Sequence, residues 1–306
     1  MKTIITFCAL FFSWSSSAMT QYELPAPGDN IVGQVQKIET VPGESLEVIA
    51  RNYGTTLLAI RQANPQLGYN TLTSSGKTLY LGNAFILPPG PREGIVINLS
   101  ELRLYYYPKD EAIVYTAPVS VGRPGWETPL TDHASIIEKK SNPTWHVPKS
   151  IKEDLQKKGI LIANEFPPGP TNPLGQYMLR LSISGYLIHG TNEPYSIGKP
   201  VTAGCIRMYP EDIKWFYEHI EKNTPVRIIN QPIKLGTYQG KLFIEAHPRI
   251  HNSKTQKEKM TSSEIAVDLK KLHLPMLEWL QANKIIARKR GYPEQMNNKI
   301  TDLLIS

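Results

Sequence analysis

Two reactive side chains lie within residues 186–209 of this 306-residue chain. Cys205 carries a thiol and His189 an imidazole, sixteen positions apart, and a loop containing glycine and proline separates them. A thiolate is a strong nucleophile, and an imidazole within reach can take the thiol proton, so this pair is typical of acyl transfer through sulfur. Gly204 permits a backbone conformation that a side chain would resist. We therefore predict that Cys205 is a nucleophile and that His189 is its general base.

Regular elements on either side of the loop are expected to position this pair. Leu187 and Ile188 end a predicted buried strand that delivers His189 to the surface. Pro210, followed by two acidic residues, indicates the start of a helix. A cysteine close to a helix N-terminus lies near the positive end of the helix dipole, and a neighbouring imidazole adds to this effect. We therefore expect the environment of Cys205 to favour the thiolate.

The residues around this pair resemble a known signature. His-Gly-Thr followed by Thr-Ala-Gly-Cys-Ile-Arg-Met is similar to the catalytic motif of the YkuD-type L,D-transpeptidases, which cross-link peptidoglycan through a cysteine. Thr202 and the residues from Gly204 to Arg207 match the usual Ser/Thr-x-Gly-Cys-x-Arg pattern, whereas Ala203 stands where many members have His or Arg. Residues 122–135 and an Asn-Pro-Leu-Gly segment at 172–175 resemble further family segments, although Asp132 and Ala134 depart from the usual Gly and aromatic residue.

The resemblance implies roles for several backbone and side-chain groups. The backbone carbonyl of Gly190 would orient the catalytic histidine, and the backbone amides of Gly204 and Cys205 are candidates for an oxyanion hole. Arg207 either binds a peptide carboxylate through its planar guanidinium or braces the catalytic loop. We place Arg207 with two further residues in the predicted substrate-binding set, namely Thr202 and Asn192.

The resemblance also implies a substrate. A peptidoglycan tetrapeptide stem would lose its terminal D-Ala and acylate Cys205, and an amine would then release the acyl group. The acceptor could be another stem, a lysine of an outer-membrane lipoprotein, a D-amino acid or water, and the sequence does not choose among them. We expect no metal and no cofactor, and we expect the partners to be peptidoglycan glycan and stem peptides rather than nucleic acid.

Length and charge set the broad organisation. A chain of 306 residues predicts two or three units. The net charge is +7, and +6 of it lies in residues 231–306. A basic surface favours nucleic acid, an anionic membrane or an anionic wall polymer, and no nucleic-acid-binding motif accompanies it.

The first 18 residues resemble a secretory signal, with Lys2, an apolar core and small residues at a cleavage site. The alternative is a membrane anchor, but the apolar run is short for a bilayer. Removal of this segment would also remove Cys8 and leave Cys205 as the sole cysteine, which cannot form an internal disulfide. We therefore expect an exported, periplasmic, wall-associated protein with a free thiol.

Residues 38–89 resemble a LysM module, which is a small βααβ carbohydrate-binding unit. Apolar residues from Leu46 to Tyr53 recur at i, i+3, i+4 and i+7, which predicts a first helix that Gly54 ends. A second helix is expected before Asn64-Pro65, and a strand at 84–87 would complete the unit. An unrelated small packing domain is the alternative.

Residues 93–230 form the predicted catalytic domain. Strand-like runs rich in β-branched and aromatic residues are separated by turns, and two of them, 95–99 and 102–107, form a predicted hairpin. Further strands are expected at 112–122, 134–140, 177–183, 186–189 and 225–230, and helices at 149–158 and 210–221. The proline-rich segment 141–176 is predicted to form one wall of a peptide-binding cleft.

Residues 231–306 form a basic C-terminal extension. It contains two predicted short strands in 232–248, a Lys-rich loop at 251–264 and an amphipathic helix at 269–290, which either packs on the catalytic domain or lies on a membrane surface. The predicted fold class is therefore mostly β with some α: a LysM module, a β-sandwich-like L,D-transpeptidase domain and a C-terminal α/β extension.

Other functions are less well supported by the residues. Ser196 and Lys199 form a Ser-x-x-Lys pair but lack the partner motifs of serine acyltransferases. A metal site from His133, His146 and His189 has no recognisable ligand spacing. Papain-like peptidases have the opposite order of cysteine and histidine, and sortase-like transpeptidases usually separate the two more widely. A non-catalytic wall-binding protein with an idle thiol is the alternative from a different class.

Overall fold

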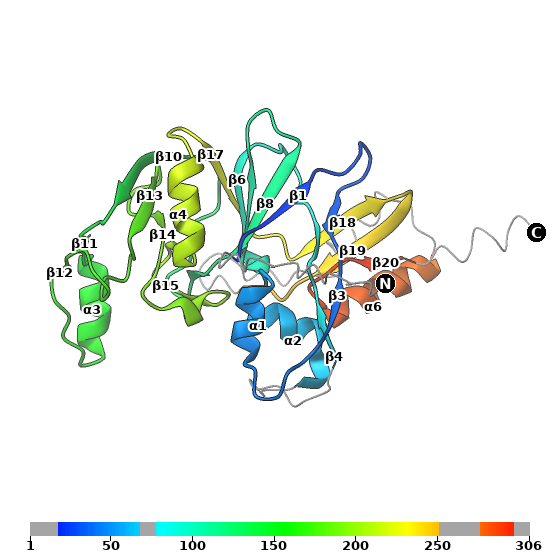
Figure 1. Ribbon diagram of the computed structural model, residues 1–306, viewed down its shortest axis with the longest axis horizontal. Coiled ribbons are helices and arrows are strands. Elements are labelled where there is room, and N and C mark those ends of the chain that lie inside the picture. Colours follow the sequence, from blue (N-terminus) through cyan, green and yellow to red (C-terminus); the bar gives the residue numbers. More distant parts are fainter. Residues whose placement is uncertain (1–17, 68–77, 251–275, 297–306) are drawn as a thin grey trace, which may run out of the picture.

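The computed structural model describes residues 18–67, 78–250 and 276–296, and its fold is mostly β, as predicted (Figure 1). One nine-stranded sheet organises the molecule, with the strand order β1-β8-β7-β6-β17-β10-β13-β14-β16. Their bounds in this order are Thr20–Glu23, Ile113–Pro118, Arg103–Tyr107, Gly94–Asn98, Pro225–Ile229, Thr131–Ser141, Tyr177–Leu181, Leu187–His189 and Ile206–Arg207.

The centre of the sheet is buried on both faces. The β6–β7 hairpin forms as predicted, through the short 3-10 helix η2 (Leu99–Glu101). All five residues of β6 are buried, which explains its continuous apolar run. Helix α4 (Pro210–His219) covers one face, where Ile213 and Phe216 join the main core. The run at 225–230, predicted as a closing strand, is instead internal, because β17 pairs in parallel with β6 and antiparallel with β10.

Strand pairing also brings the two reactive residues together. β14 pairs antiparallel with β13 and in parallel with β16, with His189 opposite Arg207 in the register. A small ladder of β15 (Pro200–Thr202) and β9 (Val121–Gly122) supports the loop that precedes Cys205. The loop between β14 and β15 contains the 3-10 helix η3 (Pro194–Ser196). Because β14 and β16 are neighbours, the histidine strand and the cysteine loop end at the same place.

A long excursion leaves the sheet between β10 and β13. It contains the two-stranded ladder of β11 (Trp145–His146) and β12 (Glu165–Phe166), with α3 (Lys149–Lys157) between them. The ring centroids of Trp145 and Phe166 lie 5.5 Å apart and hold the ladder closed. The helix expected at 149–158 is thus confirmed.

The N-terminal module has the predicted order of elements. It comprises β3 (Gln36–Glu39), α1 (Leu46–Asn52), α2 (Leu57–Ala63), the 3-10 helix η1 (Pro65–Leu67) and β4 (Thr78–Leu81). Ser45 and Thr56 cap the two helices, since their hydroxyls accept bonds from backbone amides three residues on, at 3.2 and 3.0 Å. Whether the module belongs to the LysM family stays a prediction.

The closing strand of the module differs from the expectation. β3 pairs with β4, whose Leu79 and Leu81 alternate into the module core, and not with the run at 84–87. That run forms β5 (Ala84–Ile86), which pairs with β2 (Ile31–Gly33). All three residues of β5 are buried, and the strand makes contacts with the C-terminal unit.

The residues before the module belong to the nine-stranded sheet. β1 pairs with β8 and is an edge strand of this sheet. The backbone amides of Ala18 and Met19 each donate to Oδ1 of the buried Asp212 at 3.1 Å, near the start of α4. The chain therefore leaves the sheet at β1, builds the module and returns at β6. The predicted signal segment lies, except for its last residue, outside the described residues.

The C-terminal extension is an α/β unit, as predicted. β18 (Ile233–Tyr238), β19 (Lys241–Ala246) and β20 (Glu294–Gln295) form an antiparallel sheet that α6 (Met276–Arg288) covers. The unit also contacts the module, because Arg290 donates to the backbone carbonyl of Ala63 at 3.1 Å. The predicted loop at 251–264 lies outside the described residues. In the described ranges, no helix is long and apolar enough to cross a membrane.

Candidate active site

The two predicted catalytic residues line one pocket of about 690 Å³. Cys205 and His189 share this pocket with Thr202 and Arg207, and with residues of the excursion between β10 and β13. Segment 143–151 forms one wall, which confirms that part of the proline-rich stretch borders the cleft. The structure therefore brings together a thiol and an imidazole that the sequence separates by sixteen positions.

The histidine has a defined tautomer and a neutral ring. His189 is 4% exposed, and its Nδ1 lies 2.6 Å from the carbonyl oxygen of Gly190, as predicted. Because a carbonyl only accepts, Nδ1 carries the proton and Nε2 holds the lone pair. Burial, together with the Arg207 guanidinium, lowers the pKa of His189 to about 3, although hydrogen bonds to the backbone of Gly190 and Leu174 favour the charged form. The ring is therefore a neutral base at neutral pH.

The thiol is protonated in this environment, contrary to the expectation of a favoured thiolate. Cys205 is partly exposed, and its Sγ lies 3.8 Å from the carbonyl oxygen of Gly185. Burial raises the pKa of the Cys205 thiol, although a backbone hydrogen bond at Leu187 and the charge of Arg207 act in the opposite direction.

Internal hydrogen bonds hold the cysteine loop. The amide of Gly204 donates to Thr202 Oγ1 at 3.1 Å, and the same hydroxyl donates to the carbonyl of Cys205 at 2.6 Å. Thr202 is buried in the loop and also lines the pocket, so its role toward substrate stays a prediction. The Gly204 amide, predicted as an oxyanion donor, already has a partner inside the loop. Of the two predicted oxyanion donors, the Cys205 amide is the one we retain.

Glycine is required before the cysteine, as predicted. Gly204 has φ +106°, and a Cβ at this position would lie 2.8 Å from Cε1 of Tyr186. Thr128 braces the same turn, since its hydroxyl donates to the Gly204 carbonyl at 2.8 Å and accepts from the Gly122 amide at 2.9 Å. Sequence reasoning did not assign Thr128 a role, although the Thr-Pro segment that contains it was part of the family resemblance.

Arg207 braces a loop while it lines the pocket. Its Nη1 donates to Ser196 Oγ at 2.9 Å and lies 3.3 Å from Glu193 Oε2, so it holds η3 in place. Asn192 does not fit the substrate-binding prediction. It is exposed, its Nδ2 lies 3.4 Å from the carbonyl of Thr171, and it is not among the residues that line the pocket.

The pocket has a positive lining that sequence reasoning missed. Arg123, Lys140 and Arg180 line it together with Arg207, and none of the described lining residues is acidic. Arg123 and Arg180 are held by carboxylates outside the lining, at 3.0 and 2.6 Å. Such a pocket favours a ligand that carries carboxylates.

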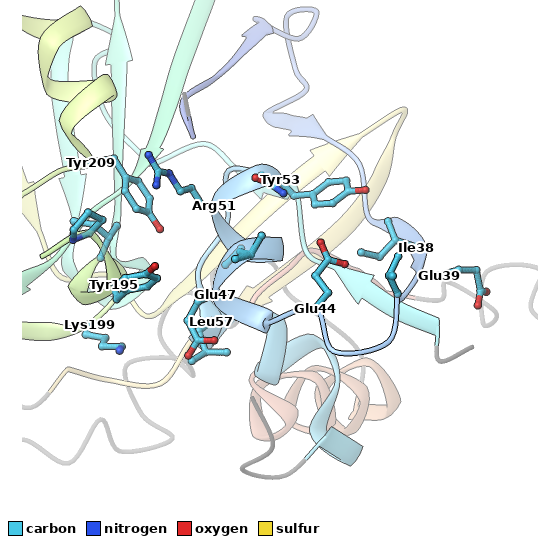
Figure 2. A pocket seen from close by; sticks show the side chains of 16 residues that line it. Ile38, Glu39, Glu44, Glu47, Arg51, Tyr53, Leu57, Tyr195, Lys199 and Tyr209 are labelled. Atoms are coloured by element: carbon cyan, nitrogen blue, oxygen red, sulfur yellow. The ribbon is translucent and has the colours of Figure 1, made fainter. Parts of the chain in front are cut away.

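A second cavity, of about 1020 Å³, lies between the module and the catalytic domain. Figure 2 shows Tyr195, Lys199 and Tyr209 at one end and Tyr53 and Glu44 at the other, with α1 between them. The residues at the first end follow β14 and precede α4, so the catalytic domain supplies them. We call this cavity the α1 groove.

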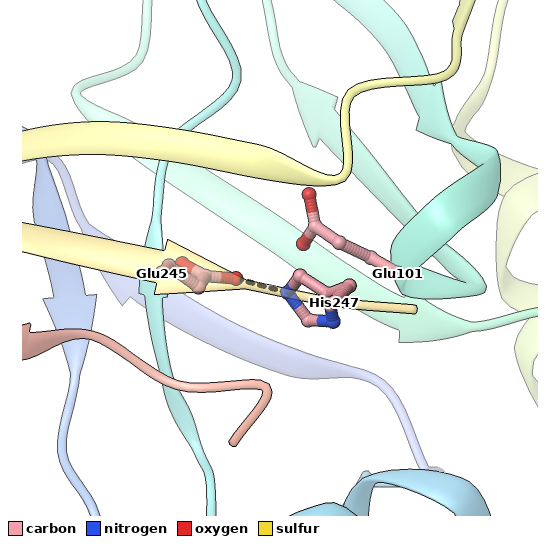
Figure 3. A group of neighbouring side chains, drawn as sticks. All are labelled: Glu101, Glu245 and His247. Carbon is pink, nitrogen blue, oxygen red and sulfur yellow. Dashed lines mark hydrogen bonds and ion pairs between the residues drawn. The ribbon is translucent and has the colours of Figure 1, made fainter. Parts of the chain in front are cut away.

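A buried charged cluster joins the catalytic sheet to the C-terminal unit (Figure 3). Glu101, Glu245 and His247 point toward one another, with His247 Nε2 at 2.6 Å from Glu245 Oε1. The three side chains could ligate a cation, but the ammonium of Lys234 already lies 2.8 Å from Glu101 and 3.1 Å from Glu245. Although burial opposes ionisation, Lys234 and His247 hold the pKa of Glu245 below its usual value. This cluster is an ion-pair network.

The fold and the pocket together define a mostly β protein with an apposed thiol and imidazole. Residues 92–228 match the family of the L,D-transpeptidase catalytic domain, YkuD. Three relatives from Escherichia coli K12 are similar over most of their length. They are "Probable L,D-transpeptidase ErfK/SrfK" (33% identical, covering 97% of each chain), "Probable L,D-transpeptidase YcfS" (37%, 80% of this chain and 78% of the relative) and "Probable L,D-transpeptidase YbiS" (36%, 84% and 85%).

The chain therefore belongs to the L,D-transpeptidase family, and it is a transpeptidase. The resemblance that its His-Gly-Thr and Gly-Cys-Ile-Arg segments indicated is confirmed for the catalytic domain.

Proposed function

We propose that this transpeptidase acts on peptidoglycan stem peptides through a thioester on Cys205. The observation that carries the proposal is one pocket that holds the thiol and a neutral imidazole whose Nδ1 is fixed by the Gly190 carbonyl. The positive lining suits a stem tetrapeptide, because such a peptide carries several carboxylates.

The first half-reaction releases the terminal D-Ala. Nε2 of His189 takes the Sγ proton as sulfur attacks the carbonyl carbon of the preceding residue, whose C–S bond forms. The backbone amide of Cys205 stabilises the oxyanion. The C–N bond then breaks, and His189 returns its proton to the departing amine. Proton transfer accompanies attack because the thiol and the imidazole are both neutral at rest.

The second half-reaction releases the acyl group to an amine. His189 takes a proton from the incoming amine, the new C–N bond forms, and the C–S bond breaks as the thiol is restored. An amine of a second stem produces a 3-3 cross-link, and a lysine of a lipoprotein produces an anchored protein. Water in place of the amine yields a tripeptide.

Two further parts of the proposal concern location and wall binding. The β-α-α-β order of residues 36–81 and the LysM-like segments within them support binding of N-acetylglucosamine-containing glycan by the module. The signal-like pattern of residues 1–18 supports export to the periplasm.

The test is incubation of the purified protein with tetrapeptide muropeptides, with mass spectrometry of the products. We expect dimers, exchanged products or tripeptides from the wild type and none from Cys205→Ala, at a loss of at least about 1,000-fold. Cys205→Ala should keep the circular dichroism spectrum and unfolding midpoint of the wild type. Transfer that persists in this folded variant would exclude Cys205 as the nucleophile.

A further inference from the structure

The α1 groove has no part in the mechanism above. It runs across α1 from the η3 loop of the catalytic domain to the turn between β3 and α1. Figure 2 places Tyr195 and Lys199 at the catalytic end, Arg51 and Glu47 along α1, and Tyr53 at the module end. An elongated groove of about 1020 Å³ suits an extended ligand better than a compact one.

The two parts that form the groove are held together. Arg51 of α1 lies 2.7 Å from Glu211 at the start of α4, and its guanidinium lies 5.3 Å from the ring centroid of Tyr209. Gly198 adopts φ +81°, and a Cβ there would lie 2.6 Å from Cβ of Thr56, so the catalytic loop and the module touch. A preformed groove costs a ligand less ordering entropy than one that must first assemble.

The lining chemistry suits a sugar chain. Tyr195 is 74% exposed and Tyr53 39% exposed, so each offers a ring face on which the apolar face of a sugar can stack. Glu44 and Glu47 can accept hydrogen bonds from hydroxyl and amide groups, and apolar side chains such as Val48 can receive acetyl methyls. The groove is lined by acidic as well as basic residues, so it attracts an anionic stem peptide less than the wholly positive pocket around Cys205 does.

The groove and the acyl pocket share one wall. Arg207, which lines the acyl pocket, donates to Ser196 Oγ at the end of η3. Tyr195, the preceding residue of η3, lines the α1 groove. A sugar chain in the groove would therefore be separated from Cys205 by one loop. A glycan whose stem peptide reaches Cys205 would have to lie at a similar distance.

We propose that the α1 groove binds an oligosaccharide of N-acetylated amino sugars and that the catalytic domain, through Tyr195, forms one end of this site. The inference rests on the proposed function, because it takes the glycan as the polymer to which the donor stem is attached. It adds that glycan binding is a joint property of module and catalytic loop, and not of the module alone.

The test is isothermal titration calorimetry of the full chain with a hexamer of N-acetylglucosamine. Tyr195→Ala at the catalytic end and Tyr53→Ala at the module end should each weaken binding about tenfold, because each removes one stacking ring. Tyr238→Ala is the matched control, since Tyr238 is 43% exposed on β18 and lies outside the groove lining. We expect this control to bind within twofold of the wild type.

Three results would overturn the inference. They are no binding by the wild type, wild-type affinity of a folded Tyr195→Ala variant, and displacement of the hexamer by a free tetrapeptide. Turnover of a free tetrapeptide, which carries no sugar, tests the proposed function separately. Hexamer binding without such turnover would overturn the transpeptidase mechanism alone, and turnover without hexamer binding would overturn the groove alone.

Discussion

Two buried histidines of this protein have opposite surroundings. His189 has a backbone carbonyl at Nδ1 and the positive Arg207 nearby, and it lines an open pocket beside a thiol. His247 has the carboxylate of Glu245 at 2.6 Å and belongs to a closed network around Lys234. In the described ranges, no carboxylate hydrogen-bonds the His189 ring.

The difference shows what makes a buried histidine a base rather than a structural partner. The Glu245 carboxylate engages Nε2 of His247 inside a closed network, and His247 does not line the pocket around Cys205. A carbonyl fixes the tautomer of His189 without adding a negative charge, and burial together with the nearby Arg207 guanidinium disfavours the cation. These surroundings support the proposed role of His189 as the proton acceptor, whereas His247 helps to hold two units together.

The largest expected effect comes from exchanging each histidine for glutamine. His189→Gln should lower kcat/KM for a tetrapeptide substrate by about 100- to 10,000-fold, because it removes the general base. His247→Gln should leave kcat/KM of the folded protein within a few-fold of the wild type and lower its free energy of unfolding by about 1–3 kcal/mol. Steady-state kinetics with urea unfolding of both variants checks this. Equal loss of activity in two folded variants would break the comparison.

The next largest effect concerns the cation at the centre of the network. Lys234→Met leaves the carboxylates of Glu101 and Glu245 facing each other in the interior, and removal of one buried partner should cost about 3–5 kcal/mol. Urea unfolding measures this free energy. Adding Glu101→Gln to Lys234→Met should recover part of the loss, because it removes one unpaired charge. A cost below about 1 kcal/mol for the single variant would contradict a network held by Lys234.

The smallest expected effect is a pH dependence that belongs to His189. Its folded pKa is about 3, below the ordinary value of 6.5, so below pH 6.5 the unfolded chain binds the additional proton. Stability should therefore fall as the pH drops from 6.5 towards 3, by about 2–3 kcal/mol at pH 4.5 from this residue. His189→Gln should lose less stability than the wild type over this range. The measurement is the free energy of unfolding by urea between pH 6.5 and 3. Equal losses in the two proteins would show that the His189 ring is not held neutral.

Local patterns predicted the parts of the fold that depend on neighbours in sequence. The β6–β7 hairpin followed from two β-rich runs around a short turn, and α4 begins at the predicted Pro210. The proximity of Cys205 and His189 was also predicted, because a nucleophile and its general base must lie close together to exchange a proton. The hydrogen bond between His189 and the Gly190 carbonyl was implied by the family resemblance in the same way.

Long-range pairing was not readable from the residues. Nothing in the segment at 20–23 indicates that it pairs with β8, about ninety residues later, because strand partners are chosen by tertiary packing. Lysine side chains are usually exposed, so the residue type alone does not indicate that Lys234 is buried. Only the folded chain shows the two carboxylates, of Glu101 and Glu245, that offset the cost of burying its charge. The hydrogen bond from the Gly204 amide to Thr202 is different, because the two residues are only two positions apart and a threonine hydroxyl often bonds nearby backbone. This local bond was readable from the sequence.

The route of the chain through β1 has a mechanical consequence. The module starts and finishes on one sheet, since β1 precedes it and β6 follows it, and Arg51 adds a third attachment at Glu211. These three attachments fix the position of the module relative to the sheet. A polymer bound by the module would therefore always lie at the same distance from Cys205, which would set how far along it the reaction can occur.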